Sequence, residues 1–166
     1  MKGRLLSLFL ILTLLSSLLV SCKESETCEF THCEMTLVLD GSFEEEESDD
    51  FDLLISNGDA VVSLIRISFE AGFSQGIIDS HTPKSFAAFF MTESGKSEEL
   101  FTHGDVPYYT YTENGVFYTV TFYRSHYAYF VITYATTEEN KDAFFEKFLL
   151  FAENAYFNDA PDINTK

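Results

Sequence analysis

The sequence predicts an α+β domain built on an antiparallel β-sheet of about six strands and completed by two helices. The first indication is a pair of apolar stretches, 51–56 and 60–69, on either side of Asn57-Gly58, a dipeptide typical of tight β-hairpins. The second is the segment 98–136, in which β-rich stretches alternate with turn residues. The third is a pair of segments, 82–95 and 136–157, with apolar residues at helical spacing.

The N-terminus is typical of a secretory signal peptide, since Lys2 and Arg4 precede an apolar run at residues 5–20. This run has 16 residues, whereas a membrane-spanning helix needs about 20, so we expect cleavage rather than a retained span. Removal of the signal peptide leaves 145 residues, enough for one domain. We therefore predict a signal peptide at 1–21, a tether at 22–34, a single domain at 35–157 and a loose tail at 158–166.

The residues at the expected cleavage site, Leu19-Val20-Ser21-Cys22, resemble the bacterial lipobox. In a lipobox the cysteine is lipidated on sulfur and becomes the first residue of the mature protein. The resemblance implies a diacylglycerol on Cys22, with acyl chains such as palmitate, and two chains hold a protein stably on a membrane. It thus implies a lipoprotein on the extracytoplasmic face of a bacterial cell membrane. The alternative is that Cys22 is an ordinary residue near a non-lipid cleavage site.

The charge of the chain excludes two classes of partner. The chain has 10 basic and 27 acidic residues, and the signal peptide contains two of the basic residues and no acidic one. The mature chain therefore has a net charge of −19 with neutral histidines. Because this charge repels nucleic acid and anionic lipid, we expect neither as a partner. Membrane attachment then depends on the lipid at Cys22.

Cys28 and Cys33 are the two remaining cysteines, and an exported protein permits a disulfide between them. If residues 28–33 are extended, the two Cα atoms lie roughly 16 Å apart, so a disulfide requires a tight loop there. The sequence leaves both states open. Together with His32 the two thiols make only an incomplete metal site, and we predict no metal.

The domain is expected to open with a short strand at 35–43, closed by a turn at Asp40-Gly41. Positions 44–50 then carry six carboxylates. These acids lack the alternate spacing and the turn glycine of a calcium loop, so a solvated connection is favoured over a cation site. Further strands follow the Asn57-Gly58 hairpin, in the segment 98–136, with turns at 103–105, Asn114-Gly115 and 124–126.

Both helices are predicted from their caps and their apolar spacing. Thr82 is a favourable N-cap, Pro83 suits the first helical position, and Ser94-Gly95 marks the end of the first helix. A capping box formed by Thr136 and Glu139 is expected to start the second helix. The buried stripe of that helix consists of Phe144, Phe148, Phe151 and Ala155.

Two segments resemble bacterial lipoproteins of the PsbP-like family. Residues 30–43, FTHCEMTLVLDGSF, resemble their opening strand, and residues 123–157 resemble their final strand and helix. Such lipoproteins often carry glycine where Cys33 stands and tryptophan where Phe130 stands. The resemblance implies a sandwich in which helices pack on both faces of the antiparallel sheet. It supplies no catalytic residues, because members of the family are mostly adaptor or scaffold domains.

Gly72-Phe73-Ser74-Gln75-Gly76 matches the G-x-S-x-G pattern of a serine-hydrolase nucleophile elbow. In an elbow the helix starts at the serine, whereas the next predicted helix begins near Pro83. The four histidines, at 32, 81, 103 and 126, show no metal-binding or catalytic spacing. We therefore predict no catalytic residues and no cofactor, and an esterase is only a distant third hypothesis for function.

Tyr108, Tyr109 and Tyr111 could form a stacking platform for a carbohydrate or peptide, because tyrosine has a broad apolar face and a polar tip. The more ordinary interpretation places them half-buried under helices. Two hypotheses follow. The first is a lipid-anchored, non-enzymatic adaptor or scaffold that binds another envelope protein. The alternative is a binding module for a small ligand or cell-wall fragment, with these tyrosines as its floor.

Overall fold

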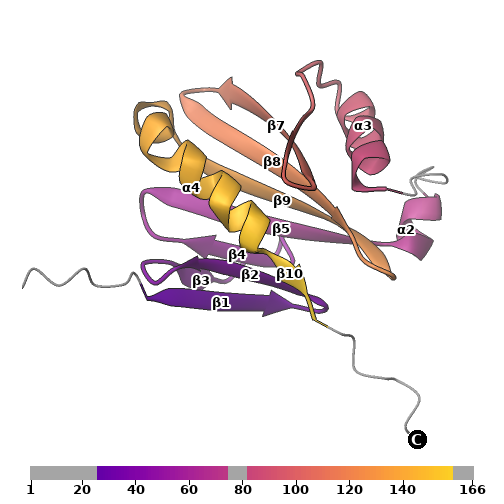
Figure 1. Cartoon of the computed structure of the whole chain (residues 1–166), viewed down its shortest axis with the longest axis horizontal. Coiled ribbons are helices and arrows are strands. Elements are labelled where there is room, and N and C mark those ends of the chain that lie inside the picture. Colours follow the sequence, from indigo (N-terminus) through magenta and orange to yellow (C-terminus); the bar gives the residue numbers. More distant parts are fainter. Residues whose placement is uncertain (1–25, 75–81, 159–166) are drawn as a thin grey trace, which may run out of the picture.

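A computed structural model describes residues 26–74 and 82–158 (Figure 1). The larger of its two antiparallel sheets has the strand order β3-β4-β5-β9-β8-β7-β6. Its strands are β3 (Glu44–Glu46), β4 (Leu53–Ser56), β5 (Ala60–Ser68), β6 (Phe101–His103), β7 (Val106–Glu113), β8 (Val116–Arg124) and β9 (Ala128–Thr137). The smaller sheet has the order β1-β2-β10, with strands β1 (Thr27–His32), β2 (Met35–Asp40) and β10 (Tyr156–Phe157). The predicted α+β class is thus confirmed, with seven and three strands instead of about six.

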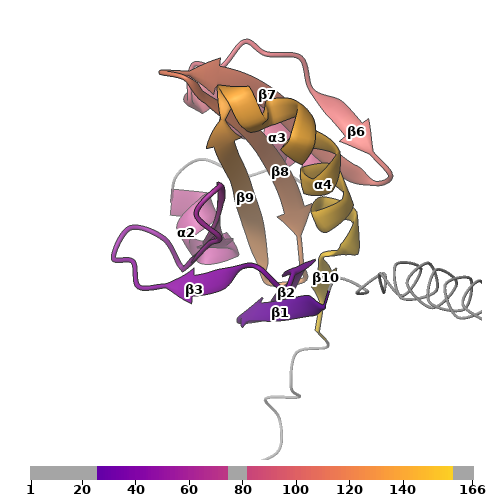
Figure 2. The same ribbon diagram turned by 90° about the vertical axis from the view of Figure 1, so that its left-hand side faces the viewer.

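Helices cover both faces of the large sheet, as Figure 2 shows. On one face α3 packs over β7 and β8 with α2 beside it, and on the other α4 and the small sheet pack together. The helical segments are α2 (Phe69–Ser74), α3 (Pro83–Glu93), the 3₁₀ turn η1 (Glu138–Asn140) and α4 (Lys141–Asn154). No helix within the described ranges is long and apolar enough to cross a membrane.

Strand β9 explains why the sheet needs cover on both faces. Successive side chains of a strand point to opposite faces. Phe130 and Ile132 belong to the core beneath α4 and the small sheet, while Tyr129 and Val131 belong to the core beneath α3. All four are buried, so the strand is apolar at successive positions instead of alternating.

The two Asn-Gly hairpins form where the sequence predicts them. Asn114 and Gly115 have φ angles of 52° and 78° and connect β7 to β8 as a two-residue loop. Both angles are positive, which asparagine and glycine tolerate best. Gly58, with φ 85°, turns the chain from β4 into β5, and the Asn57 side chain accepts the N–H of Ala60.

The first helix keeps its predicted caps, whereas the capping box predicted for the second is wrong. Thr82 accepts the N–H of Ser85 at the start of α3, and Gly95, with φ 64°, follows its end. Thr136, however, is buried in β9, where it pairs with Ala60 and donates its hydroxyl to the Asp59 carbonyl. Strand pairing therefore outweighs the local capping preference, and α4 begins only at Lys141 after η1.

The domain also begins earlier than predicted, because residues 27–32 of the expected tether form β1. Every residue of β1 pairs with β2, from Thr27 opposite Asp40 to His32 opposite Met35. The strand was missed because it is an edge strand whose residues alternate between exposed and half-buried, with only Phe30 packed against the core. The tail from 159 onward lies outside the described residues.

Candidate functional site

Several residues singled out from the sequence lie at or beyond the limits of the described chain. Cys22 and the predicted signal peptide are outside it, as is Gly76 of the G-x-S-x-G pattern. Ser74 is the last residue of the short helix α2. An elbow places its serine between a strand and the start of a helix, so the backbone at α2 does not have elbow geometry.

Cys28 and Cys33 are both free thiols, so the disulfide considered from the sequence does not form in this structure. Cys28 lies near the start of β1 and Cys33 lies in the turn after that strand. An extended strand rises about 3.3 Å per residue, so their Cα atoms are roughly 16 Å apart. A disulfide needs a Cα separation below about 7 Å.

The three candidate tyrosines do not form one platform, because they point to both faces of β7. Tyr109 is only 2% exposed and lies in the core beneath α3. Tyr108 packs toward Phe145 of α4, on the opposite face. Tyr111 is half-buried on the Tyr109 face, with Lys96 Nζ 3.8 Å from its ring centre. Within the described chain, Tyr108 and Tyr111 are therefore half-buried, as the more ordinary interpretation of the sequence expects. Tyr109 is a core residue.

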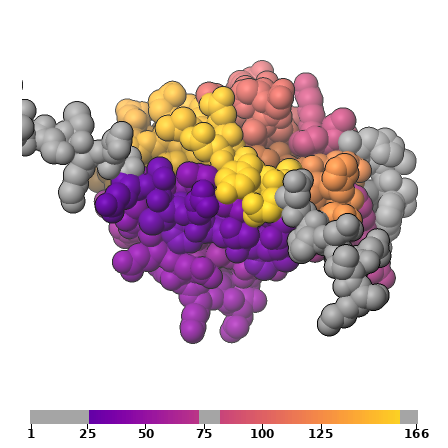
Figure 3. Space-filling model, turned by 60° about the horizontal axis from the view of Figure 1, so that its bottom comes forward, coloured from indigo at the N-terminus to yellow at the C-terminus, as the bar shows by residue number. Residues whose placement is uncertain are grey.

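A pocket of about 440 Å³ lies instead at one end of the large sheet, where three segments meet. They are the β1–β2 turn, the β8–β9 turn and the end of β10. The lining residues are Glu34, Arg124, Ser125, His126, Tyr127, Phe157 and Asn158. Figure 3 shows the orange β8–β9 turn beside the yellow C-terminal segment on the face that carries this pocket.

The β1–β2 turn brings Glu34 into the pocket wall. Cys33 and Glu34 form a two-residue loop between His32 and Met35, and Cys33 adopts a φ of 52°. This left-handed conformation favours glycine, which agrees with the glycine that the resembling lipoproteins carry there. The tight turn leaves the Glu34 side chain only 9% exposed, so its charge needs partners.

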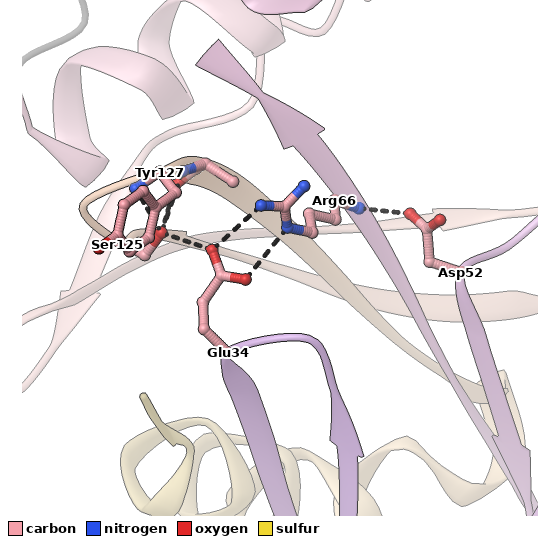
Figure 4. Close-up of polar contacts among 6 residues, drawn as sticks. Glu34, Asp52, Arg66, Ser125 and Tyr127 are labelled. Atoms are coloured by element: carbon pink, nitrogen blue, oxygen red, sulfur yellow. Dashed lines mark hydrogen bonds and ion pairs between the residues drawn. The ribbon is translucent and has the colours of Figure 1, made fainter. Parts of the chain in front are cut away.

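Glu34 is the centre of a polar cluster that joins three distant parts of the chain (Figure 4). Its Oε2 lies 3.2 Å from Nε of Arg66, on β5, and its Oε1 lies 3.4 Å from Nη2 of the same guanidinium. The Ser125 hydroxyl donates to Glu34 Oε1 at 2.8 Å, although the two residues are 91 positions apart. Arg66 is in turn fixed by its backbone N–H, which donates to Asp52 at 2.6 Å.

These contacts also set the charge state of Glu34. Burial would raise the pKa of its carboxyl group, but hydrogen bonds from Arg66, its own backbone N–H and Ser125 outweigh burial and hold the pKa below its ordinary value. Glu34 is therefore ionised at neutral pH, and its charge is matched by that of Arg66.

The lowered pKa predicts an acid-dependent loss of stability. A depressed carboxyl pKa stabilises the fold above the unfolded-state value of 4.5, and this contribution is lost as pH falls through the lower folded-state pKa. Glu34→Gln should thus reduce the free energy of unfolding by about 1 kcal/mol at pH 7. At pH 3 the reduction should be much smaller. Urea unfolding at both pH values measures the difference. The exposed Glu29→Gln on β1 controls for removing one negative charge, and an equal Glu34→Gln effect at both pH values would contradict the prediction.

Ser125 serves as a support for the β8–β9 turn. Its oxygen accepts the backbone N–H groups of Tyr127 and Ala128, both at 3.0 Å, while its hydrogen is directed to Glu34. With these contacts made, the hydroxyl has little capacity left to act as a nucleophile. The cluster is therefore suited to hold the wall of a binding pocket in place.

Arg124 is a charged residue of the pocket that, unlike Glu34, lacks an oppositely charged partner among the described residues. Its Nε is buried without a hydrogen bond, and Nη1 makes one long contact, 3.5 Å, to the Ser125 carbonyl. Its guanidinium carbon lies 4.9 Å from the ring centre of Phe69 at the start of α2. Stacking on an aromatic face fixes the plane of the guanidinium but does not neutralise its charge.

On the far side of the pocket, Asn158 holds the chain after β10 against the β1–β2 turn. Its backbone N–H donates to the Glu34 carbonyl at 2.8 Å, and its Nδ2 donates to Thr36 at 2.6 Å. Phe157 and Tyr127 supply the aromatic part of the lining, and their exposed fractions are 38% and 55%.

The sequence predicted the turn at 124–126 but not this pocket. The predicted tether includes Glu34, and nothing in the sequence links this residue to Arg66 or Ser125. The available signal was weak: an arginine beside a serine in a predicted turn of a chain with few basic residues.

The two antiparallel sheets and the helices that cover them define this protein as an α+β sandwich with a PsbP-like fold. The chain is similar to the solution structure of cyanobacterial PsbP (CyanoP) from Synechocystis, with a TM-score of 0.53 and 13% identity over 84% of this chain and 99% of that one. The predicted PsbP-like sandwich is thereby confirmed as a fold. The chain is also similar, with lower TM-scores, to two crystal structures. One is from Bacteroides thetaiotaomicron, with a TM-score of 0.47 and 11% identity over 79% of this chain and 48% of that one. The other is LpqN, involved in cell envelope biogenesis of Mycobacterium tuberculosis, with a TM-score of 0.43 and 12% identity over 81% of this chain and 91% of that one. No protein-family model and no curated protein sequence matches the chain.

Proposed function

We propose that this protein is a lipid-anchored, non-enzymatic adaptor on the extracytoplasmic face of a bacterial cell membrane, where it binds another envelope protein. The anchor is the lipid on Cys22, and no cofactor takes part. The observation that carries the proposal is the pocket at the end of the large sheet, which exposes aromatic side chains above a rigid polar cluster.

The direction of β1 supports a role in contacting a partner. The segment that leads from Cys22 enters the domain at Thr27, whereas Glu34 and the pocket lie just beyond the other end of the strand. Six strand residues span about 20 Å. The strand therefore separates the anchored end of the domain from the pocket, which leaves the pocket accessible to other proteins.

The pocket lining also has the composition of a recognition surface. Tyrosine, phenylalanine and arginine are enriched at protein interfaces, and the few residues that dominate the binding energy are often tyrosine or arginine. Tyr127 and Phe157 remain exposed although each is part of the pocket wall. The supporting residues Glu34 and Ser125 are engaged in internal hydrogen bonds, which favours binding over catalysis at this site.

Cross-linking in cells followed by mass spectrometry tests this function. We expect one stoichiometric envelope-protein partner for the lipidated chain, and loss of that partner with Cys22→Ala. Tyr127→Ala should reduce cross-linking by about tenfold, the usual effect of removing an interface aromatic residue. Leu150→Ala, at an equally exposed position on α4, is the matched control. Absence of a specific partner for the lipidated chain would contradict the adaptor proposal.

A binding module for a small ligand or cell-wall fragment is the second candidate. The pocket volume of about 440 Å³ supports it, because small-molecule sites have volumes of about 300–1,000 Å³. Thermal-shift screening of the mature chain distinguishes the two: a small ligand that stabilises the chain without any protein partner favours the module.

A further inference from the structure

Arg124 and the aromatic residues beside it indicate the chemistry of what the pocket binds. We infer that the pocket recognises a peptide carboxylate adjacent to an apolar or aromatic side chain, with Arg124 binding the carboxylate and Tyr127 and Phe157 contacting the side chain. The inference rests on the proposed binding function and specifies the partner group that the site takes.

The first argument is the unmatched charge of Arg124. A guanidinium has five N–H donors and stays ionised in proteins. Among the described residues Arg124 uses one of them, in a contact of 3.5 Å from Nη1, and its buried Nε has no acceptor. An anionic ligand at the Nη groups would form charge-assisted hydrogen bonds that the described residues do not supply.

The second argument is the contrast with Arg66, the other arginine among the described residues. Arg66 is paired with Glu34, whereas no carboxylate of the described residues lies within ion-pair distance of Arg124. Glu34 lines the same pocket as Arg124, but its carboxylate is already neutralised by Arg66 and hydrogen-bonded by Ser125. The pocket therefore has a local positive charge within a chain whose net charge is −17.

The overall negative charge limits which anion can bind. At physiological ionic strength exposed charges are screened over about 8 Å, so a single carboxylate responds mainly to nearby Arg124. A dianionic phosphate carries more charge against the same negative surroundings, and one arginine neutralises only half of it. A carboxylate matches the planar fork of arginine in both charge and geometry.

The third argument is the position of the aromatic residues. Tyr127 and Phe157 line the same pocket as Arg124 and keep exposed fractions of 55% and 38%. A free carboxylate such as acetate would leave these surfaces in water. A peptide residue with an apolar side chain would cover them and gain hydrophobic free energy as well as the ionic contact.

The test uses two fragments of the same size and side chain, N-acetyl-L-phenylalanine, which has a carboxylate, and N-acetyl-L-phenylalanine amide, which has a neutral amide in its place. Each is titrated into the ¹⁵N-labelled mature chain, with the Nε–H signal of Arg124 as the readout. We expect a saturable shift of this signal with the acid and binding at least about tenfold weaker with the amide, because ionic hydrogen bonds are roughly twice as strong as neutral ones.

Variants separate the role of Arg124 from general charge effects. Arg124→Gln should reduce binding of the acid to the level of the amide and leave the amide unchanged, whereas Tyr127→Ala should weaken both fragments. Lys84→Gln, on an exposed position of α3, removes the same charge away from the pocket and should have no effect. The backbone spectrum of each variant verifies that it is folded.

Three results would overturn the inference. The amide could bind as well as the acid, Arg124→Gln could leave acid binding unchanged, or inorganic phosphate could displace the acid at equal concentration, which would indicate a general anion site. These outcomes are independent of the cellular cross-linking. If the partner is captured with wild-type and Arg124→Gln chains alike, the adaptor function stands and the carboxylate inference fails.

Discussion

Phe148→Ala is expected to lower the free energy of unfolding by about 3–5 kcal/mol, the range for removing a fully buried phenylalanine. Phe148 is 0% exposed at the centre of α4. Its ring stacks on Tyr134 of β9, with 5.4 Å between centroids, and lies 5.5 Å from that of Phe144. The cavity left by alanine would lie where α4, the small sheet and the large sheet share one core.

Equilibrium unfolding in urea measures this effect, with Leu150→Ala as the control. Leu150 is on the same helix, two positions away, and is 52% exposed, so its truncation removes little buried area. We expect a change of at most about 0.5 kcal/mol for the control. Similar losses for the two variants would mean that α4 does not pack on the sheet as described.

The elements that could be predicted from the sequence are those with a strong local cause. Asn114, Gly115 and Gly58 define the two hairpins because their φ angles are positive, and few other residues tolerate such angles. Thr82 and Pro83 fix the start of α3 through contacts within one helical turn. In each case the residues that decide the structure are neighbours in the chain.

The elements that could not be predicted depend on distant partners. Strand β1 has little apolar character of its own, and it exists because β2 offers backbone hydrogen bonds along its whole length. Thr136 has the local signature of a helix cap, yet its position opposite Ala60 of β5 keeps it in a strand. Tertiary pairing outweighs local preference at both places.

The pocket depends even more strongly on residues that are distant in sequence, because its supporting cluster joins residues 34, 66 and 125. Each of these residues is unremarkable in its local sequence, and only the fold places a glutamate, an arginine and a serine side by side. The tyrosine cluster, in contrast, was conspicuous in sequence because it is a run. Alternation along β7 divides such a run between two faces, so the proximity in sequence does not become a shared surface.

The second large effect is expected for Arg66→Met, which should lower the free energy of unfolding at pH 7 by about 2–3 kcal/mol. Methionine keeps much of the apolar length of the arginine stem. The loss therefore reflects the Glu34 carboxylate, which is 9% exposed in the structure and loses its cationic partner in the variant. Removing one partner of a buried ion pair is costly because the other charge remains away from water.

A double-mutant cycle with Glu34→Gln tests this explanation directly. If the penalty of Arg66→Met arises from the abandoned carboxylate, the double variant should be more stable than the sum of the single effects predicts, by about 1–2 kcal/mol. Lys96→Met, which removes a longer ion pair to the exposed Glu113 and the contact with the Tyr111 ring, is the control; it leaves no buried charge unpaired and should have a far smaller effect. Additive single effects would mean that Arg66 stabilises the domain through packing, for example on Phe130, whose ring centre lies 6.0 Å from the guanidinium carbon. The position of the β1–β2 turn would then not depend on the ion pair. A positive coupling would instead identify the Glu34–Arg66 pair as the contact that holds the turn, and with it one wall of the pocket, against the large sheet.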